Sequence, residues 1–357
     1  MGGTNGHVSR TLLVSRKTPG MLLVSRGSQS NLDYETLNVS TGVSTIKAFN
    51  VTNITESSYS FVEDGLLLGW GLRNSVGVGE EPVTGAIYSV ENSVDDFNRS
   101  GKNIHQNNPG EEMNFHGYLN GTETKEQGGN YGYPTCFAAW AVDELPNNQG
   151  IQVGMQVAIG EQNSTLNDTT CQEERIPPRL TFQAHQAPLD IKFNPNGTAA
   201  WVTFHGSWYV YLPWIIHVLL LTLHRNRDEP VGYKLSYIAF DGAGSPVKDS
   251  TSNSSTVDIL SNPDLSKCPD ECIRPVALAW DSRGRLFMSS DATGEIWVVT
   301  KEDGGSVEDA SPSGGSPPSA TGSAPTESDS PGPANMNLPG LTVAHFAAVW
   351  AGMMVAI

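Results

Sequence analysis

The chain has 357 residues, a formal net charge of −17, 37 glycines and 22 prolines. Its length suits one large domain or two ordinary ones. The excess of acidic side chains excludes a nucleic-acid partner, because no field of lysine and arginine is present to neutralise phosphates. The simpler interpretation of the charge is that it keeps a secreted protein soluble.

Glycosylation signals and cysteines both indicate the secretory pathway. Four cysteines agree with an oxidising compartment and permit three pairings. We expect Cys268 to pair with Cys272 across the tight C-P-D-E-C loop, and Cys136 with Cys171; a C-x3-C metal pair is the alternative, but no further ligands flank it. Nine N-x-[S/T] sequons predict a glycoprotein, beginning at Asn38, Asn50, Asn53, Asn98, Asn120, Asn163, Asn167, Asn196 and Asn253.

The N-terminus opens as M-G-G-T-N-G-H, without the apolar segment of a signal peptide, so we expect an N-terminal piece to be missing.

Further along the chain, a pattern of apolar strand, polar turn and apolar strand recurs. It covers Arg10–Gly27, Leu189–Phe204 and Val276–Ser289, with a less regular unit at Leu66–Val90. Units too small to bury their own faces are typical of radial repetition in a β-propeller. A β-sandwich is the alternative.

One apolar run interrupts this pattern. Residues Tyr209–Arg225 show no alternation and split the motif F-H-G-S-W from the N-R-D-E-P that follows. Seventeen residues correspond to roughly fifty nucleotides, so we interpret the run as a retained intron translated in frame and not as a membrane span.

The C-terminal part has the composition of a linker followed by an anchor signal. Residues 304–335 are rich in Ser, Pro and Gly and cannot bury a core. Residues 336–357 end in the apolar run Leu341–Ile357, which is typical of a glycosylphosphatidylinositol signal, with attachment expected between Ser328 and Asn335. A tail-anchored helix is the alternative. We therefore expect an extracellular protein of the cell surface or cell wall, with a lipid anchor as its only membrane contact.

Polar residues that stand where the repeated strands end are the candidates for chemistry, because loops of successive propeller blades meet at one end of the fold. Each of them alone has a structural explanation, but several recur at the same phase of the repeat. They are His7, Arg73, Asn74, His116, His205 and Arg274.

Five motifs give a more specific indication. They are G-H-V-S-R followed by M-L-L-V-S-R-G, G-W-G-L-R-N-S-V-G, N-N-P-G-E-E-M-N, F-H-G-S-W and I-R-P-V-A-L-A-W-D, in this order between His7 and about Thr300. The set resembles the soluble quinoprotein glucose and sorbosone dehydrogenases, and above all the secreted fungal pyranose dehydrogenases that use pyrroloquinoline quinone. Two departures are the absence of the propeller segment before His7 and the split H-G-S-W loop.

The resemblance implies an all-β, six-bladed β-propeller, incomplete at the N-terminus, over residues 1–303. It implies His7 as the catalytic base. It also implies a cofactor site and a Ca²⁺ site, formed by Arg73, Asn74, His116, His205 and Arg274 and by Asn108, Pro109 and Glu111, respectively.

These residue types suit that chemistry. Arginines pair with the three carboxylates of the quinone, a hard cation takes oxygen ligands, and a neutral imidazole removes a hydroxyl proton as hydride leaves. We therefore expect oxidation of a sugar hydroxyl or hemiacetal, with electrons passed to an external acceptor such as a haem domain or a quinone. The alternatives are a Ca²⁺-dependent lactonase-like hydrolase and a non-catalytic propeller that binds wall glycans.

Overall fold

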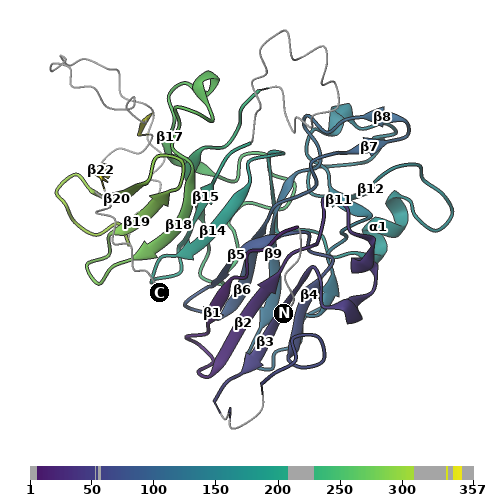
Figure 1. Cartoon of the computed structure of the whole chain (residues 1–357), viewed down its shortest axis with the longest axis horizontal. Coiled ribbons are helices and arrows are strands. Elements are labelled where there is room, and N and C mark those ends of the chain that lie inside the picture. Colours follow the sequence, from purple (N-terminus) through teal and green to yellow (C-terminus); the bar gives the residue numbers. More distant parts are fainter. Residues whose placement is uncertain are drawn as a thin grey trace, which may run out of the picture.

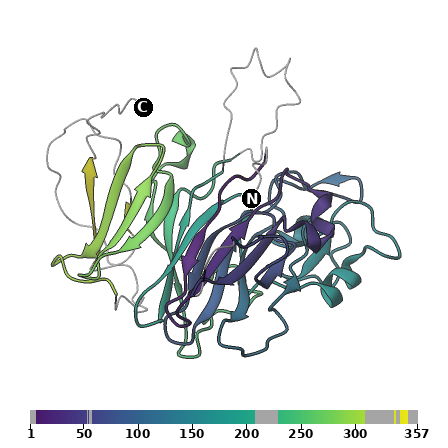
Figure 2. The same ribbon diagram turned by 60° about the horizontal axis from the view of Figure 1, so that its bottom comes forward.

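The computed structural model describes residues 6–52, 54, 58–207 and 229–308, and the backbone of two short strands beyond them, Asn335–Met336 and Leu341–Ala347. The described chain is an all-β fold in which sheets stand side by side, with one short helix, α1 (Asp168–Glu174), at the side (Figures 1 and 2). The predicted insertion at 209–225 lies outside the described residues. In the part of the chain that the structure describes, no helix is long and apolar enough to cross a membrane.

The first two sheets come from the N-terminal half. The N-terminal sheet has the order β1-β2-β3-β4-β10, and the second sheet has the order β5-β6-β9-β13. The strands of the first are β1 (Leu12–Val14), β2 (Met21–Arg26), β3 (Thr45–Asn50), β4 (Leu66–Trp70) and β10 (Gly129–Asn130). Those of the second are β5 (Ser75–Glu80), β6 (Ala86–Glu91), β9 (Glu111–Tyr118) and β13 (Leu180–Phe182).

The third and fourth sheets follow in the same way. The third is ordered β14-β15-β16-β17-β21 and the fourth β18-β19-β20-β22. Their strands are β14 (Pro188–Phe193), β15 (Ala199–Phe204), β16 (Lys234–Ala239), β17 (Val257–Ser261) and β21 (Asn335–Met336), then β18 (Pro275–Trp280), β19 (Leu286–Ser290), β20 (Glu295–Lys301) and β22 (Leu341–Ala347). The first strand of the third sheet, β14, packs against both β5 and β18. The first strands of successive sheets are therefore neighbours.

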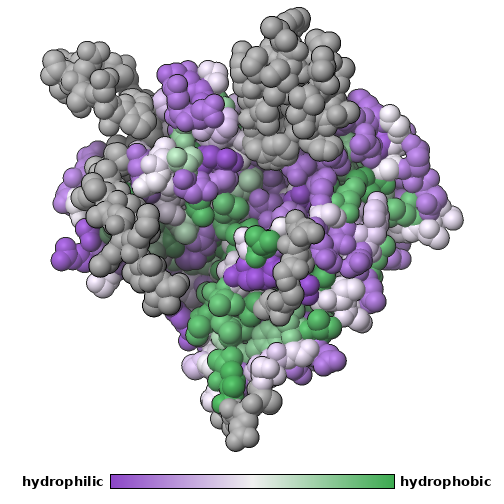
Figure 3. Space-filling view, in the orientation of Figure 1, coloured by the Kyte–Doolittle hydropathy of each residue, from purple (hydrophilic) through white to green (hydrophobic). Residues whose placement is uncertain are grey.

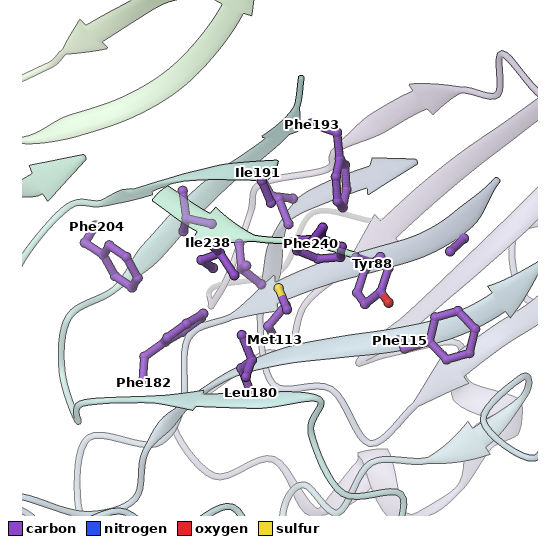
Figure 4. Packing of buried hydrophobic residues seen from close by; sticks show 14 residues of the cluster. Tyr88, Met113, Phe115, Leu180, Phe182, Ile191, Phe193, Phe204, Ile238 and Phe240 are labelled. Atoms are coloured by element: carbon purple, nitrogen blue, oxygen red, sulfur yellow. The ribbon is translucent and has the colours of Figure 1, made fainter. Parts of the chain in front are cut away.

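The third sheet is buried on both faces, which explains why β15 reads as the continuous apolar run A-A-W-V-T-F. Ala200, Val202 and Phe204 point into the core shared with the second sheet (Figure 4), while Ala199 and Trp201 point into the core shared with the fourth. A third core lies between the first and second sheets. Face-to-face packing of sheets is thus what stabilises the molecule.

Three of the four predicted repeat units are antiparallel hairpins, formed by β1–β2, β14–β15 and β18–β19. The less regular unit at Leu66–Val90 is not a hairpin. It contains β4, β5 and β6 and spans the boundary between two sheets, since β4 pairs with β3 and β5 pairs with β6. Its irregularity in sequence therefore reflects a connection between sheets and not a variant repeat.

Irregular chain and short elements connect the long strands. The longest such segment lies between β9 and β13 and carries α1. These short elements are η1 (Tyr34–Leu37), η2 (Val39–Thr41), β7 (Asn98–Arg99), β8 (Lys102–Asn103), β11 (Cys136–Ala138), η3 (Val142–Glu144), β12 (Gln156–Ala158) and η4 (Leu265–Lys267). Both predicted disulfides are confirmed, Cys136–Cys171 tying β11 to α1 and Cys268–Cys272 closing a five-residue loop.

Two parts of the C-terminal region contact the fourth sheet. Val307, just inside the predicted linker, is fully buried against the fourth sheet, and its N–H donates to Gly284 O. The backbone of Leu341–Ala347, inside the predicted anchor signal, forms β22 and pairs antiparallel with β20. At the other end, Leu12 and Val14 of β1 are 64% and 63% exposed, and apolar side chains gather over the N-terminal sheet in Figure 3.

Candidate functional site

Polar side chains gather where one end of the second sheet meets the loops of its neighbours, a region that we call the polar edge. Its strands carry Glu91 and Glu111, and the connections at this end carry Arg73, Asn92 and Ala187. The Asn92 side chain donates to Pro188 O, which fixes the second sheet to the start of the third. Residues from four separate stretches of the chain therefore meet here.

Arg73 is the most strongly held residue of the polar edge. Its side chain is 6% exposed, and its guanidinium donates to Asn31 O, Asn31 Oδ1 and Asn92 O. It also forms an ion pair with Asp95, at 3.0 Å between Nη2 and Oδ2. The backbone N–H of Arg73 also donates to Glu91 Oε1, at 2.7 Å. The guanidinium is thus a fixed positive charge between two loops.

His7 lies beside Arg73 and Asn74, as the sequence predicts. A Cβ placed on Gly27 would come within 2.7 Å of Asn74 Oδ1 and 2.8 Å of His7 Cβ, so glycine is required for this close approach. Burial, assisted by the nearby Arg73 charge, lowers the pKa of His7 to about 4. The imidazole is therefore neutral at ordinary pH, the form that accepts a proton.

In the loop that the sequence predicts to bind a metal, two side chains hold the loop in place. Asn108 is fully buried; its Oδ1 accepts from Trp140 N at 2.9 Å and its Nδ2 donates to Ala141 O. Glu111 accepts from the backbone N–H groups of Ser93 and Ala187, and burial raises the pKa of its carboxyl to about 7. Oxygen ligands for a hard cation are then best supplied by backbone carbonyls of this loop.

No group of three or more His, Cys, Asp and Glu side chains suited to a metal ion occurs among the residues with described positions. A cation here would depend on backbone carbonyls and on a bound anion. The donor chemistry nevertheless fits an anionic cofactor with a hard cation, because guanidinium, amide and carbonyl groups come together at one edge.

His205 and Arg274 form a second group. Arg274 Nη2 lies 2.9 Å from His205 Nδ1, and its Nε donates to His205 O. His205 Nε2 lies 3.0 Å from an oxygen of Asp291. This group connects to the first through Ala187, whose N–H bonds to Glu111 and whose carbonyl accepts from His205 N at 3.0 Å. The two predicted groups therefore share one loop.

His116 is not part of this edge, contrary to the sequence-based expectation. It lies five residues beyond Glu111 on β9, roughly 16 Å along the strand. Its ring is fully buried, with Nε2 2.7 Å from Ser89 Oγ and the ring packed on Tyr131, and burial lowers its pKa to about 3. The odd–even position along β9 turns His116 into the space between sheets, so it is a core histidine.

Several residues of the edge were not predicted from the sequence. Asp95 pairs with Arg73 and lies 3.9 Å from His185 Nδ1, and Ser28 bonds to His7. Their local sequences carry no motif, because their roles arise from loop contacts over long chain separations. Positive φ at His185 and Ala187 is a backbone signal of a functional loop, but it is visible only in the structure.

These features define the class: an all-β protein of side-by-side sheets with a loop-built polar site, rich in arginine and histidine, at one end. The chain belongs to the TrAA12-like family, whose profile matches residues 1–302. The resemblance predicted from the motifs is thereby confirmed.

Sequence relatives include two fungal enzymes. The pyrroloquinoline quinone-dependent sugar dehydrogenase of Hypocrea jecorina (strain QM6a) is 46% identical over 295 residues, which cover 82% of this chain and 62% of that protein. The pyrroloquinoline quinone-dependent pyranose dehydrogenase of Coprinopsis cinerea is 31% identical over 318 residues, covering 85% of this chain and 40% of that protein. The chain thus spans less than two thirds of the length of these curated relatives.

Solved structures of the same family have a similar fold. The calcium structure of the Trichoderma reesei enzyme of carbohydrate-active family AA12 superposes with a TM-score of 0.75 at 47% identity, covering 83% of this chain and 69% of that one. The holo form of the pyranose dehydrogenase quinone domain from Coprinopsis cinerea gives a TM-score of 0.71 at 31% identity, covering 82% and 69%.

Proposed function

We propose that this chain is the larger part of a pyrroloquinoline quinone-dependent sugar dehydrogenase that passes electrons to an external acceptor. The observation that carries the proposal is the placement of a neutral imidazole, His7, beside the fixed guanidinium of Arg73 at the polar edge. Oxidation of a sugar hydroxyl requires a base that takes the O–H proton while hydride leaves the neighbouring C–H bond, next to a group that binds the anionic cofactor. The names of the two fungal relatives support the same reaction class.

The side chains have distinct roles in this proposal. His7 accepts the hydroxyl proton of the sugar. Arg73 and Arg274 pair with cofactor carboxylates, and Asn74 and His205 orient the bound ring. Asp95 partly neutralises the charge of Arg73. When bound, the quinone would supply the acceptor for the hydride, which carries two electrons and one proton. Carbonyl oxygens of Asn108 and Pro109 would hold a Ca²⁺ ion, whose charge would make the quinone a better acceptor.

A complete six-bladed propeller is part of the proposal. Among the described residues four sheets have four or five strands each, besides two two-stranded sheets, and the chain covers 62% of the Hypocrea relative. The exposed leucine and valine on β1 provide a surface on which a further sheet could pack. We propose that two more blades close the ring.

The protein's location is also a proposal. Two disulfides and nine sequons support a secreted glycoprotein. The terminal apolar run supports a lipid anchor at the cell surface. A haem domain or a quinone is proposed as the electron acceptor. A lactonase-like hydrolase and a glycan-binding wall protein remain the competing functions.

Reconstitution separates these functions. The chain is titrated with quinone in the presence of Ca²⁺, alone and fused to the N-terminal region of its Hypocrea relative, and then given sugars and a redox dye. The dehydrogenase binds quinone and reduces the dye with a sugar. Hydrolysis of a lactone without quinone would instead support the hydrolase, and binding of glycans with neither reaction would support the wall protein.

A further inference from the structure

Ser28 connects the two loop segments that carry the predicted base and the predicted anion-binding arginine. It is fully buried, its N–H donates to Arg73 O at 2.8 Å, and its carbonyl accepts from His7 N at 3.0 Å. Its hydroxyl lies 2.9 Å from His7 Nδ1. Backbone bonds on both sides therefore hold the hydroxyl at a fixed place against the imidazole ring.

The hydrogen of this hydroxyl already has an acceptor. Ser28 Oγ lies 2.7 Å from Ser30 O, and a carbonyl oxygen can only accept. That distance is the usual one for O–H···O, whereas two oxygens at 2.7 Å with no hydrogen between them would repel. Because a serine hydroxyl has one hydrogen, Ser28 Oγ must act as an acceptor toward His7.

We propose that Ser28 is the positioning residue of His7: it fixes the neutral imidazole as the Nδ1–H tautomer and leaves Nε2 as the nitrogen that accepts a proton. The assignment of the tautomer does not depend on the sugar oxidation, but its role in catalysis rests on the proposed function. Ser28 does not touch the reacting atoms and acts only through the ring.

The charges around the ring agree with this assignment. Arg73 and Arg10 are positive and Asp95 is negative, and together with burial they leave the pKa of His7 well below its ordinary value. The ring is therefore neutral, and its tautomer is a matter of hydrogen bonding and not of charge. Ser28 contacts the ring with both its hydroxyl and its backbone, and both favour the Nδ1–H form.

The environment of Ser28 is rigid enough for this role. Tyr133 Oη bonds to the carbonyl groups of Ser30 and Asn31 and accepts from Asp33 N at 2.7 Å. These bonds hold the turn that carries Ser30 O, the acceptor of the Ser28 hydrogen.

The direct test is ¹⁵N NMR of the histidine rings in the full chain, with His7→Gln used to assign the signal. Above pH 6 we expect His7 to show a protonated Nδ1 and an unprotonated Nε2. A His7 ring protonated on Nε2 overturns the proposal. Because the measurement needs neither quinone nor sugar, its failure is distinct from a failure of the proposed function, which would appear as an intact tautomer without dehydrogenase activity.

Variants give a second readout. Ser28→Ala should produce a mixed His7 tautomer and lower kcat roughly five- to a hundredfold, the ratio that loss of one buried hydrogen bond gives, with KM nearly unchanged. Ser28→Thr, which retains the hydroxyl, should restore the tautomer. Ser25→Ala is the matched control, since Ser25 is also buried but its Oγ accepts from Thr11 N. An unchanged tautomer in Ser28→Ala contradicts the proposal.

Discussion

Arg73 and Asp95 form an ion pair across the polar edge, with 3.0 Å between Nη2 and Oδ2, and the aspartate is the more exposed partner, at 29% against 6%. The arginine is also held by Asn31 and Asn92, so its position does not depend on the aspartate alone. An incoming carboxylate would therefore meet an arginine that is already in place but partly neutralised.

Asp95→Asn should consequently tighten quinone binding. Removing the aspartate charge removes repulsion of the cofactor carboxylates, and roughly three- to thirtyfold is expected for about 0.7–2 kcal/mol in a partly exposed site. Quinone titration by fluorescence quenching measures it, with Asp96→Asn as the control for charge alone. Weaker binding in Asp95→Asn would show that Asp95 is needed to orient Arg73.

A pair of buried acids predicts how stability depends on pH. Glu91 and Glu112 are directly opposite on β6 and β9, each 5% exposed. Burial, together with the neighbouring carboxyl, raises the pKa of Glu91 well above its usual range, and burial raises that of Glu112 to about 7. At these two groups the folded protein holds protons that the unfolded chain releases, so the stability that the pair contributes is present at low pH and is lost as pH rises toward 7.

Glu91→Gln should reduce this dependence. At pH 8 in a chelating buffer, its melting temperature should exceed that of the native chain by roughly 2–8 °C, for 1–2 kcal/mol. Glu63→Gln, at an exposed position, is the control. A variant whose melting temperature keeps the full slope between pH 4.5 and 7 would contradict the assignment.

Two neighbouring sequons should differ in glycosylation. Asn163 is exposed, and its Oδ1 accepts from both the N–H and the hydroxyl of Thr165. Asn167 caps α1: its Oδ1 accepts from Thr170 N and its Nδ2 donates to Asn163 O. A glycan on Asn167 would replace a bonded hydrogen at a helix cap.

Peptide mass spectrometry of the secreted protein should therefore find Asn163 largely occupied and Asn167 occupied severalfold less. Thr165→Ala and Thr169→Ala, which remove one sequon each, assign the two sites. Equal occupancy would mean that modification precedes folding of this segment.

Lipid anchoring gives opposite expectations for the C-terminal strand. If the tail is exchanged for a lipid, a phosphatidylinositol-specific lipase should release the protein from cells, and Leu341–Ile357 should be absent from the mature chain. If β22 is a permanent strand, the mature protein should retain those residues and resist release. Mass spectrometry of the intact C-terminus distinguishes the two results.

Much of the fold could be predicted from local patterns. The hairpins β1–β2, β14–β15 and β18–β19 and both disulfides follow from alternation, turn residues and cysteine spacing. His7, Arg73 and Asn74 lie together as expected, because each lies in a segment that leads into a strand of neighbouring sheets. His116 does not, because one position along a strand decides which face a side chain takes, and the motif could not specify that position.

Other site residues depend on long-range contacts. Asp95 and Ser28 have partners 22 and 21 residues away, in loops whose paths are set by packing and not by local preference. Asn108, Pro109 and Glu111 were predicted as a metal site, and the structure adds that the side chains of Asn108 and Glu111 hold the loop. Only the three-dimensional arrangement separates residues that hold a loop from residues that can contact a ligand.

The most direct test of the proposed chemistry is a quinone titration of two variants in the chain fused to the N-terminal region of its Hypocrea relative. His7→Ala should bind quinone nearly as well as the parent but turn over roughly 10²–10⁴-fold more slowly, the usual contribution of a general base. Arg73→Ala, with Arg73→Lys as the milder variant, should bind quinone roughly ten- to a hundredfold more weakly. Excess quinone should restore dye reduction in Arg73→Ala but not in His7→Ala; restoration of both, or no loss in either, would contradict the roles assigned to these residues.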